Sequence, residues 1–163
     1  MNLQAEIAAR LIQKGIQKGV TVSSAESCTG GLIAKLLTDV AGSSAVFSGA
    51  CVTYTNEVKI ALLGVDPAVI EEHTEVSHAC AKAMAEGARQ RIGTTFAVST
   101  TGYAGPTGGT ETDPVGTVYI GVSTPQGSFS ERFSAPAHLD REGVREAAAT
   151  RALELLEKQI EKI

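Results

Sequence analysis

A serine followed closely by two glycines is the first group in this sequence that can do covalent chemistry. Residues 25–31 read AESCTGG, and Ser27 lies between a short apolar run and the start of a helical pattern. Backbone N–H groups at such a junction favour a phosphate or a developing oxyanion, and Gly30 and Gly31 let a ligand approach without meeting a Cβ atom. The segment has neither a P-loop Gly-Lys-Ser/Thr nor a GxGxxG fingerprint. Two interpretations of Ser27 stay open: a nucleophile, or an N-cap of the next helix and nothing more.

A serine nucleophile needs a base, and none of the three histidines stands in a suggestive position. Lysine can take this role when burial lowers its pKa from about 10.4 toward neutrality. Residues 53–59 read TYTNEVK, which puts Tyr54 at a strand end and Lys59 on the first turns of a helix. Both lie near one edge of the sheet if that strand neighbours the strand before Ser27. The alternative, which the local pattern alone favours, is a solvated lysine beside a half-buried tyrosine.

A glycine-rich segment follows a predicted strand at residues 95–101, and residues 101–109 read TGYAGPTGG. Such a segment is typical of a loop that cradles a ligand, because its amides are accessible, and Pro106 and Pro114 favour a shaped loop. It is equally compatible with a long turn.

Two arginines stand four positions apart on the first turns of the last predicted helix. Arg141 and Arg145 are placed to clamp a phosphate or a carboxylate. The alternative is that they pair with Glu142 and Glu146 on a solvated face, which is the default for arginines beside glutamates.

The elements that must position these groups alternate between helix and strand, with a hairpin late in the chain. Apolar residues at helical spacing predict a first helix that Gly19 ends, and a second helix that begins near Cys28 with Ser27 as its N-cap. Further helices are predicted at residues 56–63, around residues 80–87 and from residue 141 onward, and strands at residues 20–22, 45–54, 95–101, 115–123 and 128–134. We therefore predict one three-layer α/β domain over residues 1–163, a mixed sheet covered by helices.

Composition excludes several classes of protein. The 163 residues carry 14 Lys and Arg against 18 Asp and Glu, a net charge of −4 with no basic cluster, which argues against nucleic-acid binding. No apolar run approaches the roughly 20 residues of a membrane span, and the start lacks the apolar stretch of a secretion signal. Three cysteines without a CxxC pair predict reduced thiols in a cytoplasmic protein. The histidine and cysteine spacing predicts no metal site.

Three motifs occur in order: AESCTGG at 25–31, YTNEVK at 54–59, and TGYAGP at 101–106, which continues into GG at 108–109 and PVGTV at 114–118. Together they resemble the stand-alone nicotinamide-nucleotide amidases, which are related to the C-terminal domain of the competence-damage-inducible CinA proteins. The resemblance covers almost the entire chain. Tyr103 stands where an aliphatic residue is expected, and Thr107 where glycine is frequent. Neither departure removes a reactive group, although Tyr103 alters the wall of the expected pocket.

The resemblance implies hydrolysis of the carboxamide of nicotinamide mononucleotide to nicotinate mononucleotide and ammonia, in pyridine-nucleotide recycling. By motif position, Ser27 matches the nucleophile, Lys59 its general base and Tyr54 an assisting hydroxyl. The expected substrate-binding residues are Cys28, Thr29, Gly30, Gly31, Thr101, Gly102, Gly105 and Arg141, with Arg145 as the fallback for the phosphate. No metal or organic cofactor is expected.

The expected partner is this small-molecule substrate, with no nucleic acid and no membrane. We also expect a homo-oligomer, because enzymes of this size are often symmetric assemblies. Two other functions stay open at this point: a nucleotide-binding module without catalysis, in which Ser27 only caps a helix, and an interaction protein.

Overall fold

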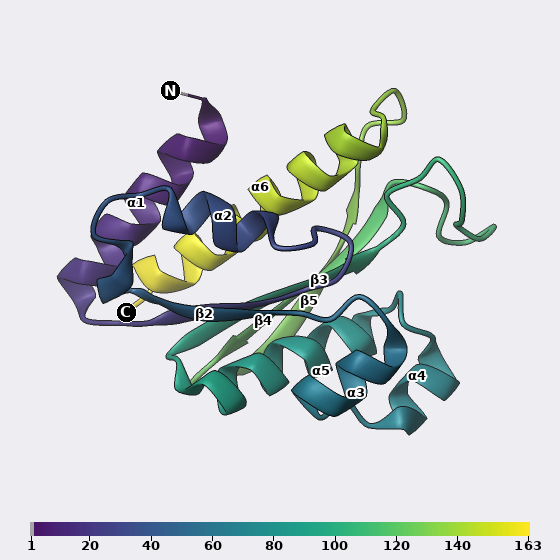
Figure 1. The fold of residues 1–163 in the computed structure, drawn as a ribbon, viewed down its shortest axis with the longest axis horizontal. Coiled ribbons are helices and arrows are strands. Elements are labelled where there is room, and N and C mark those ends of the chain that lie inside the picture. Colours follow the sequence, from purple (N-terminus) through teal and green to yellow (C-terminus); the bar gives the residue numbers. More distant parts are fainter. Residues whose placement is uncertain (1) are drawn as a thin grey trace.

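A five-stranded mixed sheet forms the middle of the computed structural model, which describes residues 2–163 (Figure 1). The strand order is β2-β1-β3-β4-β5. The inner strand β1 (Val22–Glu26) pairs in parallel with β2 (Phe47–Val52) and β3 (Phe96–Gly102), whereas β4 (Thr117–Thr124) and β5 (Gly127–Ser134) form an antiparallel hairpin beside β3. The predicted mixed sheet and the late hairpin are confirmed.

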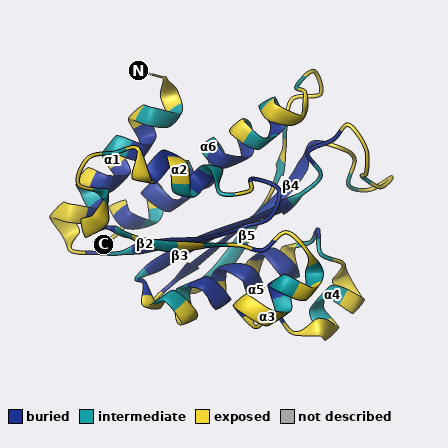
Figure 2. Cartoon of the chain, in the orientation of Figure 1, coloured by how far each residue is buried: buried dark blue, intermediate teal, exposed yellow. Residues whose placement is uncertain are grey.

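Helices cover both faces of the sheet, which confirms the predicted three-layer α/β architecture. The helices α1 (Leu3–Lys18), α2 (Leu32–Thr38) and α6 (Arg141–Glu161) lie on one face. The helices α3 (Asn56–Leu63), α4 (Pro67–His73) and α5 (His78–Ala88) lie on the other (Figure 1). Two short helical turns, η1 (Ser43–Ala45) and η2 (Arg89–Gly93), complete the elements. Figure 2 shows the buried residues concentrated in the strands and on the inward sides of the helices.

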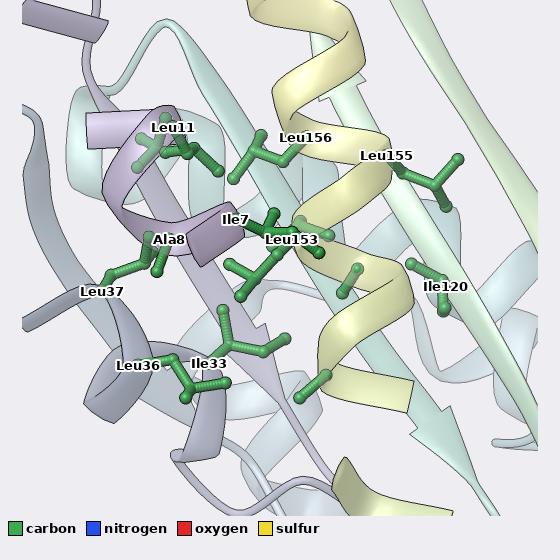
Figure 3. Close-up of a cluster of buried hydrophobic side chains, with 14 of the residues drawn as sticks. Ile7, Ala8, Leu11, Ile33, Leu36, Leu37, Ile120, Leu153, Leu155 and Leu156 are labelled. Atoms are coloured by element: carbon green, nitrogen blue, oxygen red, sulfur yellow. The ribbon is translucent and has the colours of Figure 1, made fainter. Parts of the chain in front are cut away.

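The larger core lies where α1 and α6 meet above the sheet. Ile7 and Leu11 of α1 are completely or almost completely buried and face Leu153 and Leu156 of α6 (Figure 3). Each such side chain contributes about 1.5–3 kcal/mol by leaving water. Gly19 ends α1 with a positive φ of 66°, as the sequence predicts.

Small residues let α5 approach both the sheet and α3 closely. A Cβ atom on Gly87 would lie 2.1 Å from the carbonyl oxygen of Leu63, the last residue of α3. On α5, Cys80, Met84 and Gly87 are buried and Ala83 is half-buried. This close contact sets the position of α3, which carries Lys59.

Several element boundaries differ from the prediction. The strand predicted at residues 45–54 begins at Phe47, because residues 43–45 form a helical turn, and it ends at Val52. The helix predicted to begin near Cys28 begins at Leu32. Among residues 2–163, no helix combines the length and hydropathy needed to cross a bilayer.

Candidate active site

Ser27 lies directly after the carboxyl end of β1, which runs between β2 and β3 in the sheet. Its backbone N–H donates to the carbonyl oxygen of Thr100 in β3 at 3.0 Å. On the other side, the N–H of Thr53 donates to the carbonyl of Glu26 at 2.8 Å. Two neighbouring strands therefore hold the backbone on either side of the serine, and its side chain is 8% exposed.

The predicted role of Ser27 as an N-cap is wrong, because the carboxylate of Glu26 takes that role. This carboxylate is completely buried and accepts hydrogen bonds from the N–H groups of Gly31, Ile33 and Ala34 at 3.2, 2.9 and 3.0 Å. It also accepts from the hydroxyls of Ser24 and Thr29 at 3.0 and 2.7 Å. A negative charge at a helix N-terminus is stabilised by the unpaired amides and the helix dipole. The hydroxyl of Ser27 therefore does not bind the N–H groups at the start of α2.

Lys59 reaches Ser27 from the neighbouring helix α3. Thr55 caps this helix by accepting from the N–H of Val58, as it starts just after β2. The Nζ atom of Lys59 donates to Oγ of Ser27 at 3.2 Å and to the carbonyl oxygen of Tyr54 at 3.3 Å. Lys59 is 1% exposed, so the interpretation of a solvated lysine is wrong.

Burial lowers the pKa of Lys59, since an ammonium group loses hydration when it is buried. Four groups raise the pKa of Lys59 and only partly oppose the effect of burial. In decreasing order they are Cys80, Glu75, Cys28 and Glu57. Burial also raises the pKa of Cys28 to about 12 and that of Cys80 to about 11, so both thiols stay uncharged near neutral pH. Among residues 2–163, no carboxylate lies within 4.0 Å of Lys59 to stabilise its charged form.

A cavity of about 250 Å³ opens in front of the two residues. Eight of the predicted site residues line it: Ser27, Cys28, Tyr54, Lys59, Thr101, Gly102, Gly105 and Arg141. Asn56, Tyr103, Ala104 and Thr107 also line it, and the motifs contain them without assigning them a role. Glu75 and Val76, which lie between α4 and α5, belong to no motif, and nothing in the sequence around them indicates a site.

Arg141 and Tyr54 meet at the mouth of this cavity. Arg141 donates from Nη1 to the carbonyl of Gly105 at 2.7 Å and from Nη2 to the hydroxyl of Tyr54 at 3.0 Å. The alternative pairing of Arg141 with Glu142 is therefore wrong. Tyr54 is 59% exposed, and its hydroxyl contacts Arg141. No hydrogen bond within residues 2–163 joins that hydroxyl to Ser27 or Lys59, so the direct contact between serine and lysine is the shorter route for a proton.

Arg145 organises the turn after Ser27. Its Nε donates to the carbonyl of Cys28 at 3.0 Å and its Nη2 to the carbonyl of Thr29 at 3.1 Å. The predicted pairing with Glu146 is therefore also wrong. Gly30 adopts a φ of 59°, a left-handed conformation that favours glycine, and a Cβ atom there would lie 3.1 Å from Nη2 of Arg145.

Four predicted substrate-binding residues lie outside the lining of this cavity: Thr29, Gly30, Gly31 and Arg145. The hydroxyl of Thr29 is completely buried between Glu26 and Thr100. The N–H of Gly30 donates to the carbonyl of Ser27 at 3.0 Å, and that of Gly31 donates to Glu26. The Thr29 hydroxyl and the N–H groups of Gly30 and Gly31 are therefore used within the turn, and substrate contact by these three residues stays a prediction.

Thr101 lines the cavity, but its hydroxyl already forms a hydrogen bond within the protein. This hydroxyl donates to the carbonyl of Glu75 at 2.7 Å, which ties β3 to the segment between α4 and α5. Arg145 lines a neighbouring cavity of about 580 Å³, which shares Ala104, Gly105 and Arg141 with the first.

Comparison with known proteins gives a match over nearly the whole chain. The family model described as CinA C-terminal domain matches residues 4–160. A CinA-like protein of Myxococcus xanthus is 49% identical over 154 residues, which cover 94% of this chain and 36% of that protein. A CinA-like protein of Shewanella denitrificans is 48% identical over 159 residues, with coverages of 98% and 36%. The chain thus spans just over a third of the length of these relatives.

Solved structures agree in fold over almost every residue. The competence/damage inducible protein CihA of Agrobacterium tumefaciens superposes with a TM-score of 0.92 at 41% identity, covering 96% of this chain and 94% of that one. A CinA superfamily protein of Klebsiella pneumoniae superposes with a TM-score of 0.93 at 30% identity, covering all of both chains.

Proposed function

Since the chain belongs to the CinA C-terminal domain family, we propose that it is an amidase for the carboxamide of nicotinamide mononucleotide. The products are nicotinate mononucleotide and ammonia, and the reaction recycles pyridine nucleotides. Ser27 is the nucleophile and Lys59 the general base. The resemblance of the three motifs to nicotinamide-nucleotide amidases supplies the substrate, and the geometry of the cavity supports the chemistry.

One observation carries this proposal: Nζ of Lys59 lies 3.2 Å from Oγ of Ser27, and Lys59 is 1% exposed. A buried amine with a lowered pKa is neutral over a wider range of pH, so its lone pair can accept the proton of a serine hydroxyl. The second contact of Nζ, with the carbonyl of Tyr54, fixes the direction of the amine.

In the first half of the reaction, Oγ of Ser27 attacks the carboxamide carbon while its proton passes to Nζ of Lys59. The tetrahedral intermediate then collapses, the carbon–nitrogen bond breaks, and the ammonium of Lys59 returns the proton to the leaving nitrogen. Ammonia departs and an ester joins the acyl group to Ser27. Water attacks that ester, gives its proton to Lys59, and releases the carboxylic acid as Ser27 regains its hydrogen.

The turn after Ser27 offers donors for the oxyanion of this intermediate. Among residues 2–163, no protein oxygen accepts from the backbone N–H of Cys28 or Thr29. Arg145 holds the carbonyl of Cys28, and in a trans peptide the following N–H points the opposite way, which directs the N–H of Thr29 away from Arg145. Losing one such donor costs about 2.7–4 kcal/mol of barrier.

Arg141 is the group that holds the phosphate of the nucleotide. It lines both cavities, and its guanidinium is fixed by Gly105 and Tyr54, so it presents a preoriented positive charge between them. A ligand longer than one ring thus extends from Ser27 past Arg141 into the second cavity. In this arrangement Tyr54 positions Arg141.

The test compares the wild-type protein with Ser27→Ala. We expect the wild type to release ammonia and nicotinate mononucleotide from nicotinamide mononucleotide, and Ser27→Ala to lose nearly all turnover while it keeps fold and ligand affinity. The exposed Ser44 supplies a matched control, since Ser44→Ala removes a hydroxyl outside the cavity. Tight binding without ammonia release by the wild type would reduce the protein to a nucleotide-binding module. Unchanged turnover in Ser27→Ala would discard Ser27 as nucleophile.

A further inference from the structure

The cavity at Ser27 carries two opposite charges that do not pair with each other. Arg141 contributes a guanidinium from the start of α6, and Glu75 contributes a carboxylate from the segment between α4 and α5. Arg141 is bound to Gly105 and Tyr54. Among the described residues, no basic side chain lies within 4.0 Å of the Glu75 carboxylate, and no donor forms a hydrogen bond to it.

Glu75 lines the same cavity as Ser27 and Lys59. Its charge raises the pKa of Lys59 and adds to burial in raising the pKa of Tyr103 and Cys80. Lys59 and Tyr103 both line the cavity. The hydrogen bond from Thr101 to the backbone carbonyl of Glu75 anchors the segment that carries the carboxylate.

Tyr103 adds an aromatic surface beside that carboxylate. Tyr103 lines the cavity and packs against the cluster of Val76, Ala81 and Tyr119. The face of an aromatic ring attracts cations by about 0.5–2 kcal/mol, depending on how far the cation is desolvated. Glu75 and Tyr103 together make one side of the cavity favourable for positive charge, opposite in sign to the site at Arg141.

We propose that Glu75, supported by Tyr103, recognises the positive charge of a pyridinium ring, so that the cavity selects oxidised pyridine nucleotides over their reduced forms. This inference rests on the proposed function and identifies the charge state of its substrate. An oxidised nicotinamide mononucleotide is an inner salt, with a phosphate at one end and a cationic ring at the other. The reduced dihydropyridine ring has the same shape in outline and carries no charge, so it gains nothing from Glu75.

The experiment measures binding in the Ser27→Ala background, where turnover does not interfere. Dissociation constants for nicotinamide mononucleotide and for its reduced form are determined by calorimetry, with and without Glu75→Gln. We expect Glu75→Gln to weaken binding of the oxidised nucleotide by about threefold to tenfold, the range for a partly exposed charge pair. The dissociation constant of the reduced form is expected to change by less than about twofold.

Glu57 gives the matched control. It is an exposed glutamate on α3 that also raises the pKa of Lys59, yet it does not line the cavity. Glu57→Gln is expected to leave both dissociation constants unchanged. A second variant, Tyr103→Leu, is expected to weaken the oxidised form more than the reduced form, since leucine keeps apolar volume and removes the aromatic face.

The outcomes separate this inference from the proposed function. If Glu75→Gln weakens both forms equally, or weakens neither, Glu75 does not recognise the ring charge and the inference is overturned. The proposed function then still stands if the wild type releases ammonia. If the wild type releases no ammonia while Glu75→Gln abolishes the preference for the oxidised form, the amidase proposal fails and the recognition of the cation stands.

Discussion

The amine nitrogen of Lys59 lies 3.2 Å from the hydroxyl oxygen of Ser27, although the two residues are 32 positions apart in the sequence. The contact exists because β2 pairs in parallel with β1, so the carboxyl ends of both strands meet at one edge. Thr55 then turns the chain into α3 within three residues of β2. The distance between the two reactive groups is therefore set by strand pairing and one helix cap.

A lysine base predicts that the rate rises with pH. Because the pKa of Lys59 is lowered, the neutral amine is populated at lower pH than for an exposed lysine, and the rate falls in acid as Lys59 is protonated. Lys59→Arg keeps the positive charge but cannot release its proton, so we expect a loss of about 10²–10⁴-fold in kcat. Ammonia release measured against pH checks both statements. A Lys59→Arg variant with substantial activity and the same acid limb would point to another base.

The same residue predicts a pH dependence of stability. The folded-state pKa of Lys59 lies below its unfolded value, so between the two the unfolded chain binds more protons and stability increases with pH. The penalty from Lys59 is full below the folded-state pKa and vanishes above the unfolded value. Lys59→Met removes it, so the gain in unfolding free energy of the variant over the wild type is expected to be largest in acid and to shrink as pH rises. Urea unfolding at several pH values measures this difference, and a gap that widens with pH would contradict it.

The buried Glu26 predicts a large loss on an apparently mild substitution. Glu26→Gln replaces one of the two acceptor oxygens by an NH₂ group. That group then faces hydrogen-bond donors from Ser24, Thr29 and the start of α2, to which it cannot bind. We expect a loss of about 2–4 kcal/mol in unfolding free energy, since hydrogen bonds to a charged group are worth about 1.5–3 kcal/mol and a buried donor is left unpaired. Ser24→Ala, which removes one donor only, is the control with the smaller loss. Equal stability of Glu26→Gln and wild type would mean that the carboxylate is dispensable as a cap.

The two arginines predict different kinetic effects. Arg141→Ala is expected to raise KM for nicotinamide mononucleotide about tenfold or more, because the phosphate loses a charged partner, while the unphosphorylated riboside is affected little. Arg145→Ala frees the carbonyls of Cys28 and Thr29 and is expected to lower kcat for both substrates alike. Steady-state kinetics with the two substrates separate these patterns. If Arg145→Ala raised KM only for the phosphorylated substrate and Arg141→Ala did not, Arg145 would be the residue that holds the phosphate.

The contact of Gly87 with α3 predicts a steric effect that reaches Lys59. A methyl group at Gly87 would lie 2.1 Å from the carbonyl of Leu63, which is backbone and cannot turn aside. Gly87→Ala is expected to cost about 1–3 kcal/mol in stability and to reduce kcat by moving α3. Thermal unfolding together with turnover tests this. A fully active and equally stable variant would show that α3 shifts freely without disturbing Lys59.

The layered fold was predictable because periodicity reports which face of each element is buried. The first helix, which ends at Gly19, and the helix at residues 56–63 appear in the structure as expected. The start of α2 was not predictable from local pattern. Ser27 has the chemistry of an N-cap, but the carboxylate of Glu26 binds three amides at once and displaces that role.

The candidate site was partly predictable, because its motifs lie at strand ends that meet. The burial of Lys59 was not, since it depends on how α3 packs against α5 in the folded chain. Glu75 was missed for the same reason: no motif marks a residue that only tertiary packing brings to the cavity. The homo-oligomeric state stays a prediction.

Arg145 connects the loop of the nucleophile to the last helix of the chain. During synthesis on the ribosome, the serine emerges more than a hundred residues before the guanidinium that orders its neighbouring carbonyls. Until α6 has been translated and has docked, the carbonyls of Cys28 and Thr29 therefore lack the hydrogen bonds from Arg145. For the proposed amidase, activity is therefore expected only after α6 has folded onto the turn, and chains that end before α6 are expected to be inactive.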